Sequence, residues 1–191
     1  MNPFFKIYTG PMFGSKTTRL VAEIDRSSYK GRKIYAFKAK KDKRYEAESI
    51  STHSGVTWPA VCIDDASEIL SFVEEKRDLS NILIAVDEAF MISGIDDALI
   101  SLFFKGANIV VSTIQLDANE RPFEIIKNIM PFATYIEICP AVCTKCNNDA
   151  YYTAAMFDID NVTAEERVGA KDMYEPRCSK HYKAFLKNKN V

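Results

Sequence analysis

Short apolar runs and amphipathic stretches alternate along most of the chain. Runs rich in β-branched and aromatic residues predict buried strands, and apolar residues that recur at helical spacing predict helices that cover them. The predicted strands are residues 4–9, 33–37, 81–86, 108–112 and a fifth that begins at Tyr135. The predicted helices are residues 17–29, 67–76, 95–104 and a short one near 123–129. This alternation predicts an α/β fold, with a mostly parallel sheet and helices on both faces.

Other stretches lack this periodicity. Residues 39–59 are polar and charged, so we predict a long loop there. Long loops in compact domains are often functional, which makes this one a candidate for contact with phosphate or substrate. From Cys139 onward the chain consists of short segments with charged turns, in which residues 151–157 are a plausible hairpin strand. Residues 187–191 are expected to form a frayed tail.

The first predicted strand runs directly into Gly-Pro-Met-Phe-Gly-Ser-Lys-Thr at residues 10–17. This segment matches the phosphate-loop pattern G-x-x-x-x-G-K-[ST], except that the second glycine stands one place early, as Gly14, with Ser15 before Lys16. In such a loop the backbone amides turn toward phosphate oxygens, the lysine contacts the β- and γ-phosphates, and the hydroxyl of Thr17 contacts Mg²⁺. The sequence therefore predicts a P-loop NTPase sheet of the RecA-like kind.

Asp87 and Glu88 end the third predicted strand. A carboxylate at this place holds Mg²⁺ beside the P-loop hydroxyl, because the carboxyl ends of parallel strands share one edge. Neighbouring residues on a strand point in different directions, so Asp87 can serve the metal through water while Glu88 acts as general base. The alternative is that the pair caps the next loop. The predicted nucleotide-binding residues are Gly10, Pro11, Met12, Phe13, Gly14, Ser15, Lys16, Thr17 and Asp87.

Three of the five cysteines gather late in the chain with a histidine. The pairs Cys143-x-x-Cys146 and Cys178-x-x-His181 have the spacing of two zinc knuckles, and a zinc ion with four protein ligands has a structural role. The alternative is a set of reduced, unconnected thiols. The expected domains are residues 1–138, a P-loop nucleotide-binding α/β domain, and residues 139–191, a zinc-binding domain. Cys62 and Cys139 are predicted to be small buried apolar residues, and His53 a surface residue.

The composition of the chain argues against nucleic acid and membranes as binding partners. The chain has 191 residues, 47% of them hydrophobic, which is enough for one sizeable core. Its formal charge of −1 provides no general attraction to nucleic acid or to an anionic membrane. No apolar stretch approaches the roughly 18 residues of a membrane span, and the first strand begins without a signal peptide, so we expect a cytoplasmic protein with no membrane partner.

Taken together and in this order, these motifs resemble those of the type II thymidine kinases, which have a zinc-clamped lasso. Further segments are similar to family motifs over most of the chain. They are Lys41-Asp42-Lys43-Arg44-Tyr45, Thr52-His53, Leu116-Asp117 with Arg121-Pro122-Phe123, Ala141-Val142-Cys143, and Val168-Gly169-Ala170-Lys171-Asp172-Met173-Tyr174.

The resemblance implies transfer of the γ-phosphoryl group of Mg-ATP to the 5′-hydroxyl of thymidine, or of deoxyuridine, to give the monophosphate in nucleotide salvage for DNA synthesis. In that scheme Lys16 holds the ATP phosphates, Glu88 accepts the hydroxyl proton and Arg44 offsets charge on the transferring group. The zinc is structural, and a homotetramer is common in the family. The implied thymine-pocket residues are Met12, Leu116 and Tyr174, with Phe90, Met91 and Phe123 as further apolar candidates.

The phosphate loop departs from the family order. The family has Ser-Gly-Lys where this chain has Gly14-Ser15-Lys16, so we expect Ser15 to adopt a positive φ that glycine would adopt at lower cost. Two alternatives stay open, the first because an Asp-Glu pair after a strand also suits an ATPase, and the second because of this Gly14-Ser15 order. One is a P-loop ATPase whose Glu88 activates water and whose zinc module binds a partner. The other is a nucleotide-binding relative without kinase activity.

Overall fold

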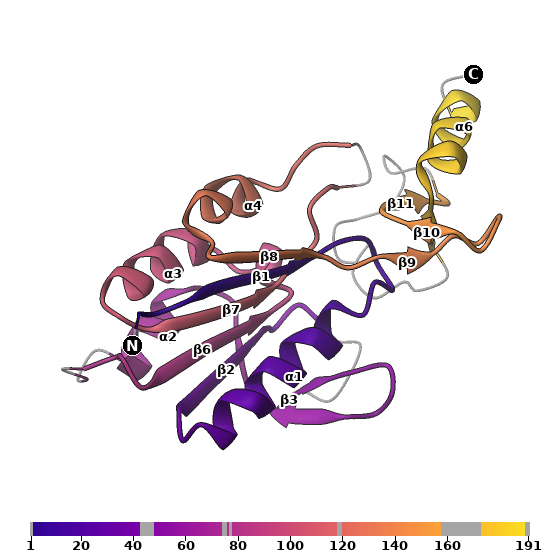
Figure 1. Ribbon diagram of the computed structural model, residues 1–191. Coiled ribbons are helices and arrows are strands. Elements are labelled where there is room, and N and C mark those ends of the chain that lie inside the picture. The colour runs from indigo at the N-terminus through magenta and orange to yellow at the C-terminus, as the bar shows by residue number, and fades with distance from the viewer. Residues whose placement is uncertain are drawn as a thin grey trace.

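The computed structural model describes residues 2–42, 48–73, 76, 78–117, 120–157 and 173–189. Its centre is a six-stranded sheet in the order β5-β2-β6-β7-β1-β8, and each neighbouring pair is parallel (Figure 1). The strands are β1 (Phe5–Thr9), β2 (Lys33–Ala39), β5 (Val61–Ile63), β6 (Ile82–Asp87), β7 (Asn108–Ser112) and β8 (Tyr135–Ile138). The predicted α/β class is confirmed.

Helices cover both faces of this sheet. One face packs on α1 (Lys16–Tyr29), whose buried apolar residues join a cluster with Ala36, Leu83 and Val110 of the strands. The opposite face packs on helices whose apolar residues join the larger cluster with Ile84 and Val111. These helices are α2 (Ser67–Val73), α3 (Ile95–Phe104) and α4 (Glu124–Ile129), and two short 3-10 helices are η1 (Ala89–Met91) and η2 (Met130–Phe132). Successive residues of these strands therefore point to opposite faces of the sheet and pack in different clusters.

The prediction of a loop over residues 39–59 was wrong in part. This stretch contains an antiparallel hairpin of β3 (Ser49–Ser51) and β4 (Thr57–Pro59). Ile50 is buried, and with Trp58 it packs on the α1 side of the sheet. Strands of three residues are too short to show an alternating pattern in the sequence. The edge strand β5 escaped prediction for the same reason.

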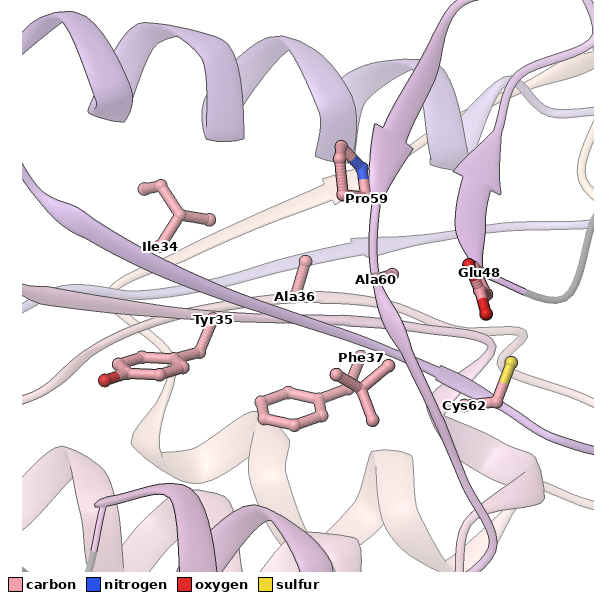
Figure 2. Close-up of a pocket in the computed structure, with 9 residues that line it drawn as sticks. Ile34, Tyr35, Ala36, Phe37, Glu48, Pro59, Ala60 and Cys62 are labelled. Carbon is pink, nitrogen blue, oxygen red and sulfur yellow. The ribbon is translucent and has the colours of Figure 1, made fainter.

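An open groove lies beside β2, where the chain passes from β4 into the edge strand β5 (Figure 2). It encloses 660 Å³ and is lined by Ile34, Tyr35, Ala36, Phe37, Glu48, Pro59, Ala60, Val61 and Cys62. In Figure 2 Ile34 and Ala36 point toward the α1 side of β2, whereas Tyr35 and Phe37 point to the other side. Among the described residues that line the groove, none belongs to the predicted nucleotide or substrate site.

The last part of the chain lies beyond the carboxyl ends of the central strands (Figure 1). It contains β9 (Ala141–Val142) paired with β10 (Asp149–Ala150), β11 (Tyr152–Ala155) paired with β12 (Tyr174–Arg177), and helix α6 (Ser179–Lys189). The predicted strand at 151–157 is thus confirmed as β11. The predicted frayed tail at residues 187–191 is corrected in part, because α6 continues to Lys189; residues 190 and 191 lie outside the described residues. Within the described ranges, no helix combines the length and the apolar character that a bilayer crossing needs.

Candidate nucleotide site and zinc site

The P-loop joins β1 to the first turn of α1. Its backbone turns through Phe13 and Ser15, which both have positive φ values, of 66° and 56°. The amide of Gly14 donates to the carbonyl of Pro11 at 3.3 Å. Lys16 is 6% exposed, and its ammonium donates to the same carbonyl at 2.7 Å. The Lys16 side chain therefore folds back across the P-loop. The amides of this loop and the N-terminus of α1 favour the binding of an anion here.

The positions of the two loop glycines have a steric cause. A Cβ on Gly14 would lie 2.5 Å from the carbonyl oxygen of Cys139, and one on Gly10 would collide with the same oxygen. Ser15 has the left-handed conformation that was expected, at the N-cap of α1. A non-glycine residue in this region costs about 1 kcal/mol or more. The shifted glycine thus serves a close backbone approach at 14 and leaves strain at 15.

Asp87, the carboxylate predicted to bind Mg²⁺, contacts Thr17 at the end of the P-loop. The hydroxyl of Thr17 lies 3.2 Å from Oδ1 and 3.3 Å from Oδ2 of Asp87, which ends β6 and is buried. A hydroxyl and a carboxylate are oxygen donors of the kind that Mg²⁺ takes, so these residues fit that ion. Glu88 follows, also buried, with a strained φ of 50°. Strain at a buried carboxylate on this edge is a pattern typical of functional residues.

Sequence reasoning missed a second buried lysine at this edge. Lys38 is 2% exposed and stands beside Asp87 in the register of β2 and β6. Its side chain continues the face of Ile34 and Ala36, toward α1, and its ammonium donates to the carbonyl of Ser49 at 3.3 Å. A lysine within an apolar strand, in phase with residues that face the P-loop helix, was the signal that could have identified it.

The P-loop also contacts the segment that contains the zinc ligands. The amide of Met12 donates to the hydroxyl of Thr153 on β11, at 3.1 Å. Gln115, next to Leu116, donates to the carbonyl of Tyr151 at 3.4 Å. The structure therefore brings Met12 and the neighbour of Leu116 to one short segment, the first residues of β11 and Tyr151 just before it. Thr153 was not among the predicted site residues, and nothing in its local sequence marks it.

The other predicted substrate residues lie in two places. Phe90, Met91 and Phe123 are partly buried against the larger core cluster, with the rings of Phe90 and Phe123 centred 4.8 Å apart. Tyr174 begins β12, and its ring lies edge-on to that of Phe157 at 5.3 Å. Arg44 and residues 168–172, to which further sequence similarity was assigned, lie outside the described residues.

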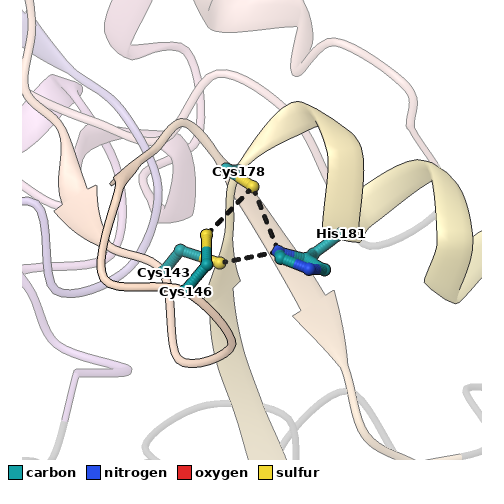
Figure 3. Close-up of side chains that lie close together, drawn as sticks. All are labelled: Cys143, Cys146, Cys178 and His181. Carbon is teal, nitrogen blue, oxygen red and sulfur yellow. Dashed lines mark hydrogen bonds between the residues drawn. The ribbon is translucent and has the colours of Figure 1, made fainter.

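The four predicted zinc ligands converge (Figure 3). Their ligand atoms lie within 4.8 Å of one another. Sγ of Cys146 is 3.7 Å from Sγ of Cys178, and Nδ1 of His181 is 3.6 Å from Sγ of Cys143 and 3.3 Å from that of Cys178. Tetrahedral zinc with Zn–S bonds near 2.3 Å sets its ligands about 3.5–3.8 Å apart, so the donor set and its spacing fit Zn²⁺.

A backbone turn and the start of a helix position these ligands. After Cys143 the chain turns back through Asn147, which has a φ of 59° and donates its amide to the Cys143 carbonyl at 2.9 Å. Cys178 precedes α6, which then presents His181 from its first turn. Burial acts to raise the pKa of the Cys143 thiol, but hydrogen bonds lower it to about 6. They come from the backbone amides of Cys178 and Lys145 and from the side chains of His181 and Cys146. A thiolate is the form that binds metal.

The two remaining cysteines differ from each other. Cys139 is buried, as predicted, and burial raises the pKa of its thiol. Cys62 is only half-buried and lines the groove at β5, so the prediction of burial holds for Cys139 alone.

The sheet, its P-loop, the strand-end carboxylate and the cysteine and histidine cluster define a P-loop α/β protein with a site that can hold zinc. The family model described as "Thymidine kinase" matches residues 4–182, and the chain belongs to the thymidine kinase family. This confirms the resemblance seen in the motifs. Membership supports a nucleoside kinase function and implies the use of ATP.

Proposed function

We propose that this protein transfers the γ-phosphoryl group of Mg-ATP to the 5′-hydroxyl of thymidine. The observation that supports this most directly is the contact of Thr17 with Asp87, which joins the P-loop to a strand-end carboxylate at the ligand-binding edge of a parallel sheet. Phosphoryl transfer depends on positioning and on neutralising charge, and the residues at this edge are suited to both tasks.

Each residue has a role that its chemistry allows. Lys16 leaves the Pro11 carbonyl and binds the phosphates together with the loop amides. Thr17, with Asp87 acting through water, holds Mg²⁺, which offsets phosphate charge when it is bound. Glu88 takes the proton of the attacking hydroxyl, and Arg44 is proposed to balance charge on the transferring group.

The acceptor site is proposed to lie between the P-loop and β11. The Met12–Thr153 hydrogen bond supports this, because it brings the loop next to the segment that the zinc would clamp. Met12, Leu116, Tyr174, Phe90, Met91 and Phe123 are the proposed pocket residues. We also propose that residues 1–138 and 139–191 act as donor and lasso domains of a cytoplasmic homotetramer, whose zinc is structural.

A phosphoryl-transfer assay with thymidine, deoxyuridine and deoxycytidine, and with an acceptor-free control, tests this function. Formation of thymidine monophosphate with little ATP loss in the control is the expected result. ATP hydrolysis that is independent of acceptor would contradict the kinase and favour the ATPase alternative.

One observation favours a second candidate, a nucleotide-binding relative without turnover. Ser15 keeps a φ of 56° within the P-loop, a conformation in which glycine would be less strained. Tight binding of Mg-ATP and thymidine with no product would support this candidate.

A further inference from the structure

The tip of the β3–β4 hairpin touches the P-loop. The ring of His53, in the turn between the two strands, stacks on the ring of Phe13, with centroids 6.1 Å apart and an angle of 28° between the planes. The two residues belong to segments that are far apart in sequence, and the contact was not expected from either one. It joins a surface histidine to the loop that holds the phosphates in the proposed function.

Hydrogen bonds between Thr52 and Val56 close the turn that contains His53. Thr52 is 3% exposed, and its amide donates to the carbonyl of Val56 at 2.8 Å. Its hydroxyl accepts from the amide of Val56 at 3.0 Å and lies 3.1 Å from the same carbonyl. A side chain held between closing hydrogen bonds fixes the direction of the residue that follows it.

The base of the hairpin is fixed as well. Ile50 is fully buried in the cluster on the α1 side of the sheet. The carbonyl of Ser49 accepts from the buried ammonium of Lys38. The base of the hairpin is therefore seated on the same face of the sheet as α1, the helix that follows the P-loop.

The backbone of Phe13 has a strained conformation that a contact with a neighbouring group can stabilise. Its φ of 66° is in the left-handed region, which costs a bulky side chain free energy. The residue is 37% exposed and belongs to neither of the two core clusters on the faces of the sheet. A strained backbone persists only where its surroundings determine it, and the ring of His53 is such a surrounding group.

We propose that His53 is a positioning residue of the nucleotide site. By stacking on Phe13 it holds the P-loop backbone in the conformation that turns its amides toward the phosphates. This rests on the proposed function only in that the P-loop binds the triphosphate of ATP. His53 acts through Phe13, and the geometry needs its ring rather than its charge.

Calorimetric binding of Mg-ATP to the full chain, without nucleoside, tests this role. His53→Ala is expected to weaken binding by about 3- to 10-fold, the range for one aromatic pair. His53→Phe should restore binding because it keeps a ring, whereas His53→Leu, of similar bulk, should not. Val56→Ala is the matched control, since this exposed side chain lies on the same turn. Circular dichroism and thermal unfolding confirm that each variant folds.

A double-mutant cycle with Phe13→Ala assigns the effect to the pair. The double variant Phe13→Ala/His53→Ala should bind no more weakly than Phe13→Ala alone. Wild-type affinity in His53→Leu, weak binding in His53→Phe, or losses that multiply in the double variant would each overturn the proposal. Absence of ATP binding in the wild type would overturn both this proposal and the kinase. Normal binding without nucleoside phosphorylation would overturn only the kinase.

Discussion

The hydroxyl of Thr17 lies within 3.3 Å of both carboxylate oxygens of Asp87, which joins the first turn of α1 to the end of β6. These residues are 70 positions apart, and the parallel sheet brings them together at one edge. A pair of oxygen donors that is already in place needs little rearrangement to accept Mg²⁺.

Asp87→Asn tests this pair. The amide keeps the shape of the side chain but removes the negative charge that attracts the metal. We expect turnover to fall by about 10²-fold and the Mg²⁺ requirement to rise. Steady-state kinetics across a Mg²⁺ titration measure both effects, with Asp25→Asn, at an exposed position on α1, as the control. An unchanged Mg²⁺ dependence would exclude Asp87 from the metal site.

Glu88→Gln tests the general base. It keeps a hydrogen-bonding group but cannot take a proton, so turnover should fall by about 10²-fold or more. Binding of Mg-ATP, measured by calorimetry, should stay near that of the wild type. Glu124→Gln, at an exposed position on α4, is the matched control. If Glu88→Gln turns over at the wild-type rate, another group accepts the proton.

Cys146→Ser tests the zinc site. Loss of one of four ligands should release the metal and destabilise the segment that contains it. Metal content measured by atomic absorption should fall from one zinc per chain to near zero. Cys62→Ser should keep its zinc, because that cysteine lies outside the cluster. Retention of a full zinc complement by Cys146→Ser would contradict the four-ligand site.

The two loop positions 14 and 15 should respond in opposite ways. Ser15→Gly relieves a positive φ, so the free energy of unfolding should rise by roughly 0.5–1 kcal/mol. Gly14→Ser places a Cβ 2.5 Å from the Cys139 carbonyl oxygen, and it should lower that free energy by about 1–3 kcal/mol. Urea denaturation measures both changes. A stabilised Gly14→Ser variant would show that the close approach is readily relaxed.

The sequence predicted the elements and motifs whose signal is local. The strands β1, β2, β6 and β7 are mainly apolar and five to seven residues long, and both zinc knuckles are defined within four positions. The P-loop was visible even with its glycine displaced, because its lysine and hydroxyl kept their spacing.

What the sequence did not predict depends on contacts between distant segments. Thr153 meets Met12 across 141 positions. Lys38 acquires its place from the register of β2 against β6. Helix α6 was missed because Lys and Asn outnumber its apolar residues, and packing of Tyr182 on Tyr152 supports it instead.

The contact between the loop glycines and Cys139 limits how the chain can evolve. The group that both glycines approach is a main-chain carbonyl, which every residue type possesses. No substitution at position 139 can therefore make room for a side chain at position 10 or 14. If a lineage lost either glycine, the backbone after β8 would have to move away from the P-loop. The segment that leads to the first zinc ligand, Cys143, would have to move with it.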